Sequence, residues 1–483
     1  MKKYIYIIAG LFLLTGCFKD STEYYEEIPA WGYVNTFARN MMNIYYLWQD
    51  DISEKLDPAN WSANENPIEK IKEIKYRDDY WTMLTDDFDS FYSSVSGVET
   101  TCGLEFKLYV YGDNNSDRLC GVVTYTYENS PARNAGLKRG DVFLKIDGKE
   151  LTMDNYADII YGTIYGGKTS TLEMGDGRSV ILTPVKMYEN PVHTYKVIDL
   201  GVKKIGYLHY TSFTLDSCAE LVEVGRLFRE EGISELVLDL RYNGGGYVIT
   251  SELLASMLAP EEVVKKGSVL STMVYNKALT EYFESKGEDT NSYFKITHSY
   301  TDDSSHSVSY STEGANMGIN KIYALVTGNS ASASESLLCS LYPYIDIVTI
   351  GQKTHGKYCS GLMMAAEDFY TTYSEQLGKE YSATGLKKTE NWGLYVMFGR
   401  FADKDGKTRC MPDGIYPDIE VIDNPSEAYP LGDTRERLLS AAISLSQGII
   451  LESTKVSVGT KEIPAVDFHR PGFGVYIANQ PIR

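Results

Sequence analysis

Short apolar runs alternate with amphipathic helical patterns between residues 205 and 350, and this alternation constrains the fold more than any other feature of the chain. The apolar runs have the length of buried strands, and apolar residues three and four positions apart follow most of them. The expected strands are residues 205–209, 235–240, 321–326 and 346–350, and the expected helices are residues 217–231, 248–258 and 333–342. Crossover helices connect parallel strands. The sequence therefore predicts an α/β core with a largely parallel sheet.

One stretch interrupts the alternation. Residues 263–320 are rich in Ser, Tyr, Asp and Thr and follow neither period. We interpret them as an insertion or a partly ordered lid. The core as a whole is expected to extend over residues 191–425, and residues 426–483 are expected to form a C-terminal helix and tail.

A glycine-rich turn follows the second expected strand, where the sequence DLRYNGGG occupies residues 239–246. Consecutive glycines permit backbone conformations and close approaches that a side chain would block. Such a turn can cradle phosphate, but it lacks the Lys-Ser/Thr of a P-loop and the spacing of a dinucleotide fingerprint. Its N–H groups can equally face an oxyanion. Taken alone, the turn favours a structural role.

The next junction between a strand and a helix carries the sequence SASASE at residues 330–335. Ser332 and Glu335 have the spacing of a capping box, so Ser332 could serve only to cap the helix. A serine at a helix N-terminus is also held rigidly, with the Ala333 amide and the positive helix end beside its hydroxyl. Ser332 is therefore a candidate nucleophile, provided that a base accompanies it.

Lys357 is the strongest candidate for that base. It ends the sequence GQKTHGK at residues 351–357, just after the following expected strand. A lysine acts as a base only when it is neutral, so its pKa must fall by several units from about 10.4, which burial can achieve. The spacing alone favours a structural or surface lysine.

A β-rich segment precedes the core, since apolar and polar residues alternate with period two from about residue 101. The sequence SPARNAGLKRGD at residues 130–141, followed by IDGK at residues 146–149, resembles a PDZ domain of the form found in bacterial proteases. We assign residues 98–190 to this module.

The PDZ resemblance implies a sheet edge to which a peptide adds as a further strand, with its terminal carboxylate held by backbone N–H groups of a loop. Residues 156–161 would form the helix beside this groove. The module could also serve for packing alone. The residues that would form the carboxylate loop are Gly103, Leu104, Glu105 and Phe106.

The three core motifs together resemble, in order and spacing, the S41 family of carboxyl-terminal processing proteases. The resemblance extends over about residues 98–425 with the PDZ module included. It implies that Ser332 is the nucleophile and that Lys357, 25 residues further on, is the general base. The oxyanion donors implied by the family are the amide of Ala333 and one of Gly244 or Gly245.

Three positions complicate this assignment. Many family members have a Gln four residues after the lysine to orient it, whereas this chain has Gly361. His355 stands where the family usually has an aromatic residue, close enough to Lys357 in sequence to compete for the role of base. His209, on an expected strand after the PDZ module, is a further alternative base, because some tricorn-like relatives pair Ser with His.

The first residues have the features of an export signal. Two lysines precede an apolar run of residues 4–14, which is too short to span a bilayer and suits a signal peptide. The sequence LTGC at residues 14–17 resembles the bacterial lipobox, which implies removal of residues 1–16 and lipidation of Cys17. Residues 17–29 are expected to be a polar tether. Residues 30–97 carry two helical patterns and are expected to form a small helical domain.

Composition excludes several function classes. The net charge of -20 repels phosphate backbones, so nucleic acid is not an expected partner. No cluster of Cys and His has the spacing of metal ligands, and neither a metal nor a cofactor is expected. Six cysteines remain beside Cys17, and the sequence leaves both disulfides and buried thiols open. It does not indicate an oligomeric state.

The sequence therefore predicts a multidomain α+β protein with a helical N-terminal domain, a PDZ domain and an α/β protease core. The expected function is that of a serine endopeptidase, lipid-anchored in the bacterial cell envelope at the outer membrane, that acts on peptides or proteins. The alternative is a non-catalytic lipoprotein that binds peptides on a retired protease fold. A third possibility, a glycan-binding surface protein, rests on the 39 tyrosines.

Overall fold

The computed structural model describes residues 29–96, 98–112, 116–301, 306–449, 465–466 and 476–477. The expected signal peptide, Cys17 and the tether up to residue 28 lie outside the described residues. Within these ranges, no helix is both long and apolar enough to cross a membrane.

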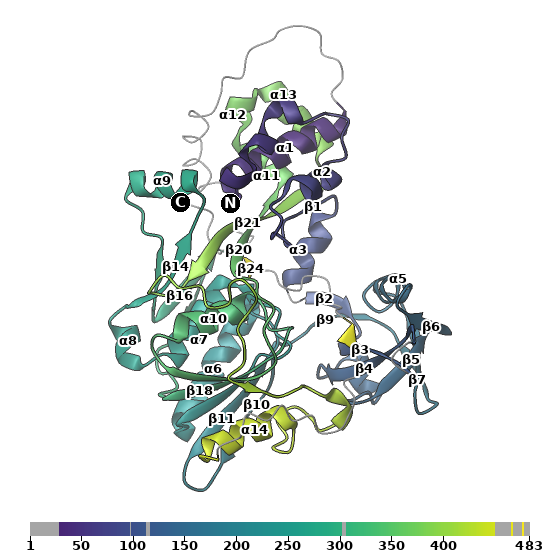
Figure 1. Cartoon of the computed structure of the whole chain (residues 1–483), viewed down its shortest axis with the longest axis vertical. Helices are drawn as coiled ribbons and strands as arrows, with labels where there is room; N and C mark the ends of the chain where they lie inside the picture. Colours follow the sequence, from purple (N-terminus) through teal and green to yellow (C-terminus); the bar gives the residue numbers. More distant parts are fainter. Residues whose placement is uncertain are drawn as a thin grey trace.

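The core contains the predicted parallel sheet, with strand order β10-β11-β12-β18-β19-β22 (Figure 1). All neighbours from β11 to β22 pair in parallel, and β10 is antiparallel to β11. The strands are β10 (Val192–Asp199), β11 (Lys204–Tyr210), β12 (Glu235–Asp239), β18 (Lys321–Val326), β19 (Asp346–Gly351) and β22 (Ile419–Glu420). The α/β core expected from the alternation is thus confirmed.

Helices cover both faces of this sheet. On one face lie α6 (Cys218–Glu231), α7 (Val248–Leu258) and α10 (Ala333–Leu341), and on the other lies α14 (Arg437–Ser446) (Figure 1). Strand β12 shows why, because Leu236 and Leu238 join the larger core while Val237 points into the cluster under α14. Successive residues of a strand face opposite sides of the sheet, so a fully apolar strand needs cover on both.

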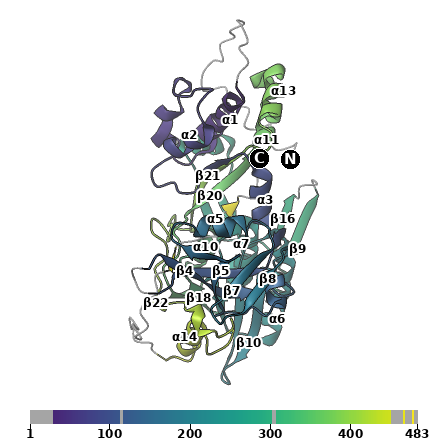
Figure 2. The same cartoon turned by 90° about the vertical axis from the view of Figure 1, so that its right-hand side faces the viewer.

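The PDZ module has its own hydrophobic core and lies to one side of the α/β core (Figures 1 and 2). Its sheet has the strand order β23-β3-β4-β6-β5-β7-β8. The elements are β3 (Leu104–Val110), β4 (Arg118–Thr126), α4 (Pro131–Asn134), β5 (Val142–Ile146), β6 (Lys149–Thr152), α5 (Tyr156–Gly162), β7 (Ser170–Met174), β8 (Ser179–Leu182) and β23 (Ala465–Val466). A two-stranded ribbon of β2 (Val98–Thr101) and β9 (Val185–Tyr188) connects the module to its neighbours.

A second sheet, absent from the sequence-based expectation, joins the two ends of the chain. Its strand order is β13-β24-β20-β21-β14-β15, and β1 pairs with β21. The strands are β1 (Met83–Thr85), β13 (Gly246–Tyr247), β14 (Val269–Val274), β15 (Asn291–Tyr293), β20 (Cys359–Ala365), β21 (Gly393–Ala402) and β24 (Tyr476–Ile477). Residues 263–320 supply β14 and β15, so this part of the segment belongs to the body of the protein instead of forming a lid.

The N-terminal helices share one hydrophobic core with the residues around β20 and β21. Helix α1 (Ala30–Tyr45) packs on β21, and the hydroxyl of Tyr370 donates a hydrogen bond to the carbonyl of Tyr33 at 2.6 Å. The other helices of this layer are α2 (Pro67–Ile74), α3 (Phe88–Ser96), α11 (Ala366–Thr372), α12 (Ser374–Leu377) and α13 (Lys379–Lys388) (Figure 1). The region thus depends on distant segments for its core.

Candidate active site

The two predicted junctions between strands and helices meet at the carboxyl ends of the neighbouring central strands β12 and β18. The carbonyl of Asn243, in the glycine-rich turn, accepts hydrogen bonds from the Ala331 amide and the Ser334 hydroxyl, both at 3.0 Å. The Ser330 hydroxyl donates to the carbonyl of Leu240 at 2.8 Å. These bonds fix the start of α10 beside the turn, so the candidate nucleophile and the candidate oxyanion donors occupy one site.

Ser332 immediately precedes α10 in an uncommon backbone conformation, with φ 61° and ψ −108°. A non-glycine residue held at positive φ is strained, and such strain gathers at functional sites. The side chain is fully buried and has the predicted capping-box placement at the start of α10, but its hydroxyl oxygen makes no hydrogen bond of regular geometry to a described residue. A buried hydroxyl without a partner costs free energy, so its retention favours a role beyond helix capping.

Glu335 connects Ser332 with the loop that carries Lys357. One carboxylate oxygen accepts the amides of Ser332 at 3.0 Å and Lys357 at 2.9 Å. The other accepts the Gly356 amide at 2.7 Å and the Thr354 hydroxyl at 2.5 Å. Burial raises the pKa of this carboxyl to about 7, against the lowering effect of the four donors. The capping-box residue thus holds the two candidate catalytic segments together.

Lys357 is fully buried, and burial lowers the pKa of its amine from 10.5 to about 7. Its Nζ donates a hydrogen bond to the Tyr395 hydroxyl at 2.9 Å. The same nitrogen lies 4.9 Å from the centroid of the Tyr395 ring and 5.9 Å from that of Trp81. A substantial fraction of this lysine is therefore neutral near pH 7, as a general base requires.

The N-terminal helical region contributes to the site, which the sequence did not indicate. The Asp79 carboxylate accepts the backbone amides of Trp81 and Thr82, both at 2.9 Å, and the Tyr46 hydroxyl at 2.8 Å. The Thr82 hydroxyl accepts the Met397 amide of β21 at 3.1 Å. These contacts hold the Trp81 ring against Lys357, and the charge of Asp79 partly opposes the fall of the lysine pKa.

The backbone amides considered as oxyanion donors differ in whether they already donate a hydrogen bond. The Gly245 amide donates to the Asn243 side chain at 2.9 Å. No hydrogen bond of the Gly244 or Ala333 amides is found within the described chain. Gly245 and Gly246 have φ of 115° and 136°, which side chains rarely adopt, and a Cβ at Gly246 would lie 2.3 Å from the Phe213 carbonyl oxygen. The glycines therefore shape a turn that leaves amides available to a ligand.

Two stretches of the chain match family models. Residues 204–421 match the model of peptidase family S41, and residues 122–165 match that of the PDZ domain. Residues 204–421 form a peptidase family S41 domain. The protein is accordingly a serine-type peptidase of the C-terminal processing type, with peptides or proteins as substrates.

Individual relatives of this S41 peptidase cover most of its length. A protein of Staphylococcus aureus (strain N315) described as a CtpA-like serine protease is 26% identical over 420 residues, which cover 84% of this chain and 70% of that protein. A similarly described protein of Staphylococcus haemolyticus (strain JCSC1435) is 26% identical over 377 residues, or 78% of this chain and 65% of that protein. The crystal structure of a Bacteroides fragilis NCTC 9343 protein described as an S41 protease has a TM-score of 0.64, at 23% identity, and covers 89% of this chain and 100% of that chain.

The two histidines considered as alternative bases lie in different surroundings in the S41 peptidase. His355 is half-buried, and its backbone amide donates to the Ser330 carbonyl at 3.0 Å. His209 is fully buried among rings at the boundary with the PDZ module, with centroids 5.3 Å from Tyr125 and 4.9 Å from His193. Burial lowers the pKa of His209 well below its usual value. No described contact of either imidazole involves Ser332.

The PDZ edge expected to accept a peptide is paired with this chain's own described residues at Leu108 and Tyr109 only. Gly103 has φ 60°, and its amide donates to the Thr101 hydroxyl at 3.0 Å. Leu104, Glu105 and Phe106 begin β3, which pairs with β4 on one side and with β23 on the other. Strand β24 similarly pairs with β13 next to the glycine-rich turn and with Gly361 of β20. Both edges thus accept an extended backbone.

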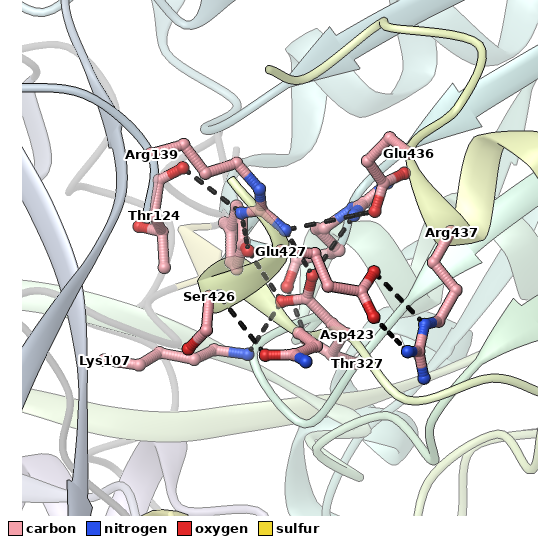
Figure 3. Close-up of polar contacts among 12 residues, drawn as sticks. Lys107, Thr124, Arg139, Thr327, Asp423, Ser426, Glu427, Glu436 and Arg437 are labelled. Atoms are coloured by element: carbon pink, nitrogen blue, oxygen red, sulfur yellow. Dashed lines mark hydrogen bonds and ion pairs between the residues drawn. The ribbon is translucent and has the colours of Figure 1, made fainter. Parts of the chain in front are cut away.

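A buried ion network connects the PDZ module to the glycine-rich turn of the S41 peptidase (Figure 3). Arg241, which precedes the turn, binds Glu436 with two nitrogens at 2.6 and 2.8 Å and Asp239 through Nε at 2.9 Å. Asp423 accepts Arg139 of the PDZ module at 2.7 Å and Arg241 at 3.2 Å. Burial would raise the pKa of Asp423, but the surrounding cations hold it well below its usual value.

The described cysteines are reduced, and one of them, Cys359, acts on the pKa of the Lys357 amine. The six cysteines beyond Cys17 are buried free thiols. Across the ranges that the structure describes, no group of three or more His, Cys, Asp or Glu side chains could hold a metal ion.

Proposed function

We propose that the protein is a serine endopeptidase in which Ser332 is the nucleophile and neutral Lys357 is the general base. The Ser332 hydroxyl loses its proton to Lys357 Nζ while its oxygen bonds to the peptide carbonyl carbon. The resulting ammonium returns the proton to the leaving amine as the carbon–nitrogen bond breaks. Water then hydrolyses the acyl-enzyme by the same two steps.

The oxyanion that forms in each step needs hydrogen-bond donors fixed in advance. We assign this role to the amides of Ala333 and Gly244, because neither donates to another described group while the Gly245 amide is already engaged. The start of α10 adds the positive end of a helix.

The proposal rests on two observations on segments that Glu335 joins: a serine with a strained backbone and an unpartnered hydroxyl, and a buried lysine whose pKa is about 7. Glu335 joins their backbones through one carboxylate oxygen. A hydrogen bond between Ser332 and Lys357 is not present here. Catalytic hydrogen bonds often tighten only in the substrate complex, and the serine hydroxyl has the capacity to form this one.

Hydrolysis of an unstructured protein by the wild type and by Ser332→Ala tests the assignment. We expect kcat to fall by roughly 10³-fold or more, because the variant lacks the nucleophile. The melting temperature should stay near that of the wild type, since the lost hydroxyl makes no hydrogen bond. Undiminished hydrolysis by the variant would refute the mechanism.

We also propose that the PDZ module selects substrates by their C-termini at the outer edge of β3. The support is that this edge already pairs with an extended segment at β23. Proteins with a free, flexible C-terminus should be cleaved faster than the same proteins amidated there. Equal rates would remove the carboxylate from the proposal.

We further propose a cellular location for the peptidase. Lipidation of Cys17 would anchor the peptidase in the bacterial cell envelope, at the outer membrane. The lipobox-like sequence at residues 14–17 supports it. Cys17→Ser should abolish labelling by a radioactive fatty acid and release the protein from the membrane fraction, and retained labelling would contradict it.

A further inference from the structure

Lys357 Nζ contacts Tyr395, a residue 38 positions away in the chain that no sequence motif marks. Tyr395 lies within β21 and is 2% exposed. It pairs with Met363 across the two strands, so its ring extends diagonally over Gly361 toward the lysine. The hydroxyl oxygen lies 2.9 Å from Nζ.

Gly361 leaves the space that this ring occupies. A Cβ at position 361 would lie 2.2 Å from two Tyr395 ring carbons and 2.5 Å from its hydroxyl oxygen. No side chain fits there while the tyrosine keeps its place. Any side chain at position 361 would therefore displace the Tyr395 ring.

We propose that Tyr395 positions Lys357 for proton transfer and that Gly361 is the glycine that admits it. The inference rests on the proposed role of Lys357 and goes beyond it by naming the group that orients the amine. Tyr395 acts through Lys357 and is a positioning residue, not a catalytic one.

The geometry of a neutral amine explains why such a group is needed. Its nitrogen carries one lone pair and two N–H groups, and a base works only when the lone pair is directed at the proton to be removed. Donation of one N–H to the Tyr395 oxygen fixes one of the three directions around Nζ. The lysine side chain, which is otherwise flexible, loses much of its rotational freedom.

The same residue supports the charge that appears during the reaction. When Nζ takes the serine proton it becomes a buried ammonium, which is costly unless acceptors surround it. The Tyr395 oxygen accepts a hydrogen bond from it, and the ring faces of Tyr395 and Trp81 attract the cation at 4.9 and 5.9 Å. The tyrosine therefore serves both protonation states of the lysine.

The test is Tyr395→Phe, which keeps the ring and removes only the hydroxyl. We expect kcat to fall by about 10- to 100-fold with KM nearly unchanged, because part of the general-base contribution is lost. The rising limb of kcat/KM against pH should also move to lower pH, since the ammonium loses an acceptor that favours it. A merely structural tyrosine would leave this limb in place.

A neighbouring tyrosine provides the matched control. Tyr358 is also buried and packs on the Trp81 ring at a centroid distance of 5.8 Å. Tyr358→Phe should leave kcat and the pH limb near those of the wild type. A second variant, Gly361→Ala, should lower kcat through displacement of the Tyr395 ring, and should cost little more in the Tyr395→Phe background.

The outcomes separate this inference from the function on which it rests. If Lys357→Met stays active, the proposed general base is wrong and the inference fails with it. If Lys357→Met is inactive while Tyr395→Phe keeps wild-type kcat and pH dependence, the inference alone is overturned. An inactive Lys357→Met with a shifted limb in Tyr395→Phe supports both.

Discussion

Arg241 and Lys357 are both fully buried cations at the edge of the parallel sheet, yet their surroundings differ. Arg241 contacts three carboxylates, those of Asp239, Asp423 and Glu436. Burial would lower its pKa, but these charges raise it well above its usual value. Lys357 Nζ contacts a phenol hydroxyl and lies near two aromatic rings, and burial lowers its pKa to about 7 against the opposing charges of Cys359, Asp79 and Glu335.

A buried basic side chain can thus serve in two ways, as a permanent charge that holds segments together or as a group that exchanges its proton. Arg241 is permanently ionised, and its carboxylate partners join the glycine-rich turn to the PDZ module and to the segment before α14. Lys357 instead occupies a place where ionisation is unfavourable, so its proton can be exchanged near neutral pH. The first arrangement fixes the geometry of the site, whereas the second has the exchangeable proton that the proposed general base requires.

The largest expected effect on stability follows from removal of the compensated charge. Arg241→Met would leave three buried carboxylates without their shared cation, and we expect it to lower the free energy of unfolding by about 3–5 kcal/mol. Denaturant titration measures this change. The control is Arg437→Met, whose ion pair with Glu427 is more exposed, at 28% and 31%, and it should cost at most about 1 kcal/mol. Equal losses of unfolding free energy in the two variants would mean that the buried network stabilises the protein no more than the exposed ion pair does.

Removal of the second cation should have the opposite sign. Lys357→Met replaces a costly buried amine by an apolar side chain of similar length, and we expect the free energy of unfolding to rise by about 1–4 kcal/mol near pH 6. Between pH 7 and 10.5 the unfolded wild type binds more protons than the folded state, so wild-type stability rises with pH across this window.

The advantage of Lys357→Met should therefore be largest below pH 7 and should vanish above about pH 10.5. Melting temperatures of both proteins at pH 6 and pH 9 measure the trend. A variant that is less stable than the wild type at pH 6 would mean that nearby groups stabilise the charge of Lys357, as carboxylates do for Arg241.

A smaller effect concerns the chain's own segments at the two peptide-accepting edges. Strand β24 pairs with β13 and β20 beside the site, and β23 pairs with β3 of the PDZ module. Because an added strand uses the same backbone groups as a bound peptide, a chain ending at residue 449 should have a KM a few-fold lower, about 2- to 5-fold. Steady-state kinetics on a short peptide checks this. A higher KM would show that these segments build the groove instead of competing for it.

Short-range sequence patterns predicted the parallel sheet, its helices and the positions of the S41-like motifs. The apolar strands of the parallel sheet and the helices that follow them have short-range periods, and the S41-like motifs at Ser332 and Lys357 are contiguous in the chain. The PDZ module was recognisable for the same reason. The role of Glu335 was visible only as a capping residue, because its contact with Lys357 spans 22 positions.

The sequence did not predict the second sheet or the residues around the lysine amine. Strand β21 pairs with β1, β14 and β20, which come from three separate parts of the chain. Trp81 reaches Lys357 from the N-terminal layer. Tyr395 is one of 39 tyrosines and has no neighbouring motif. Glu436 lies 195 positions from Arg241. Such contacts depend on tertiary packing, which no period or short motif encodes.

The most direct test of the central claim is a titration of the lysine ε-carbons by 13C NMR, with Lys357→Met used to assign the Lys357 signal. We expect the signal missing from the variant to change its chemical shift with a midpoint near pH 7 in the wild type. Exposed lysines should titrate near pH 10.4, as is usual for this side chain. If the Lys357 signal also titrates near pH 10, the amine is ionised at neutral pH and cannot be the base for Ser332.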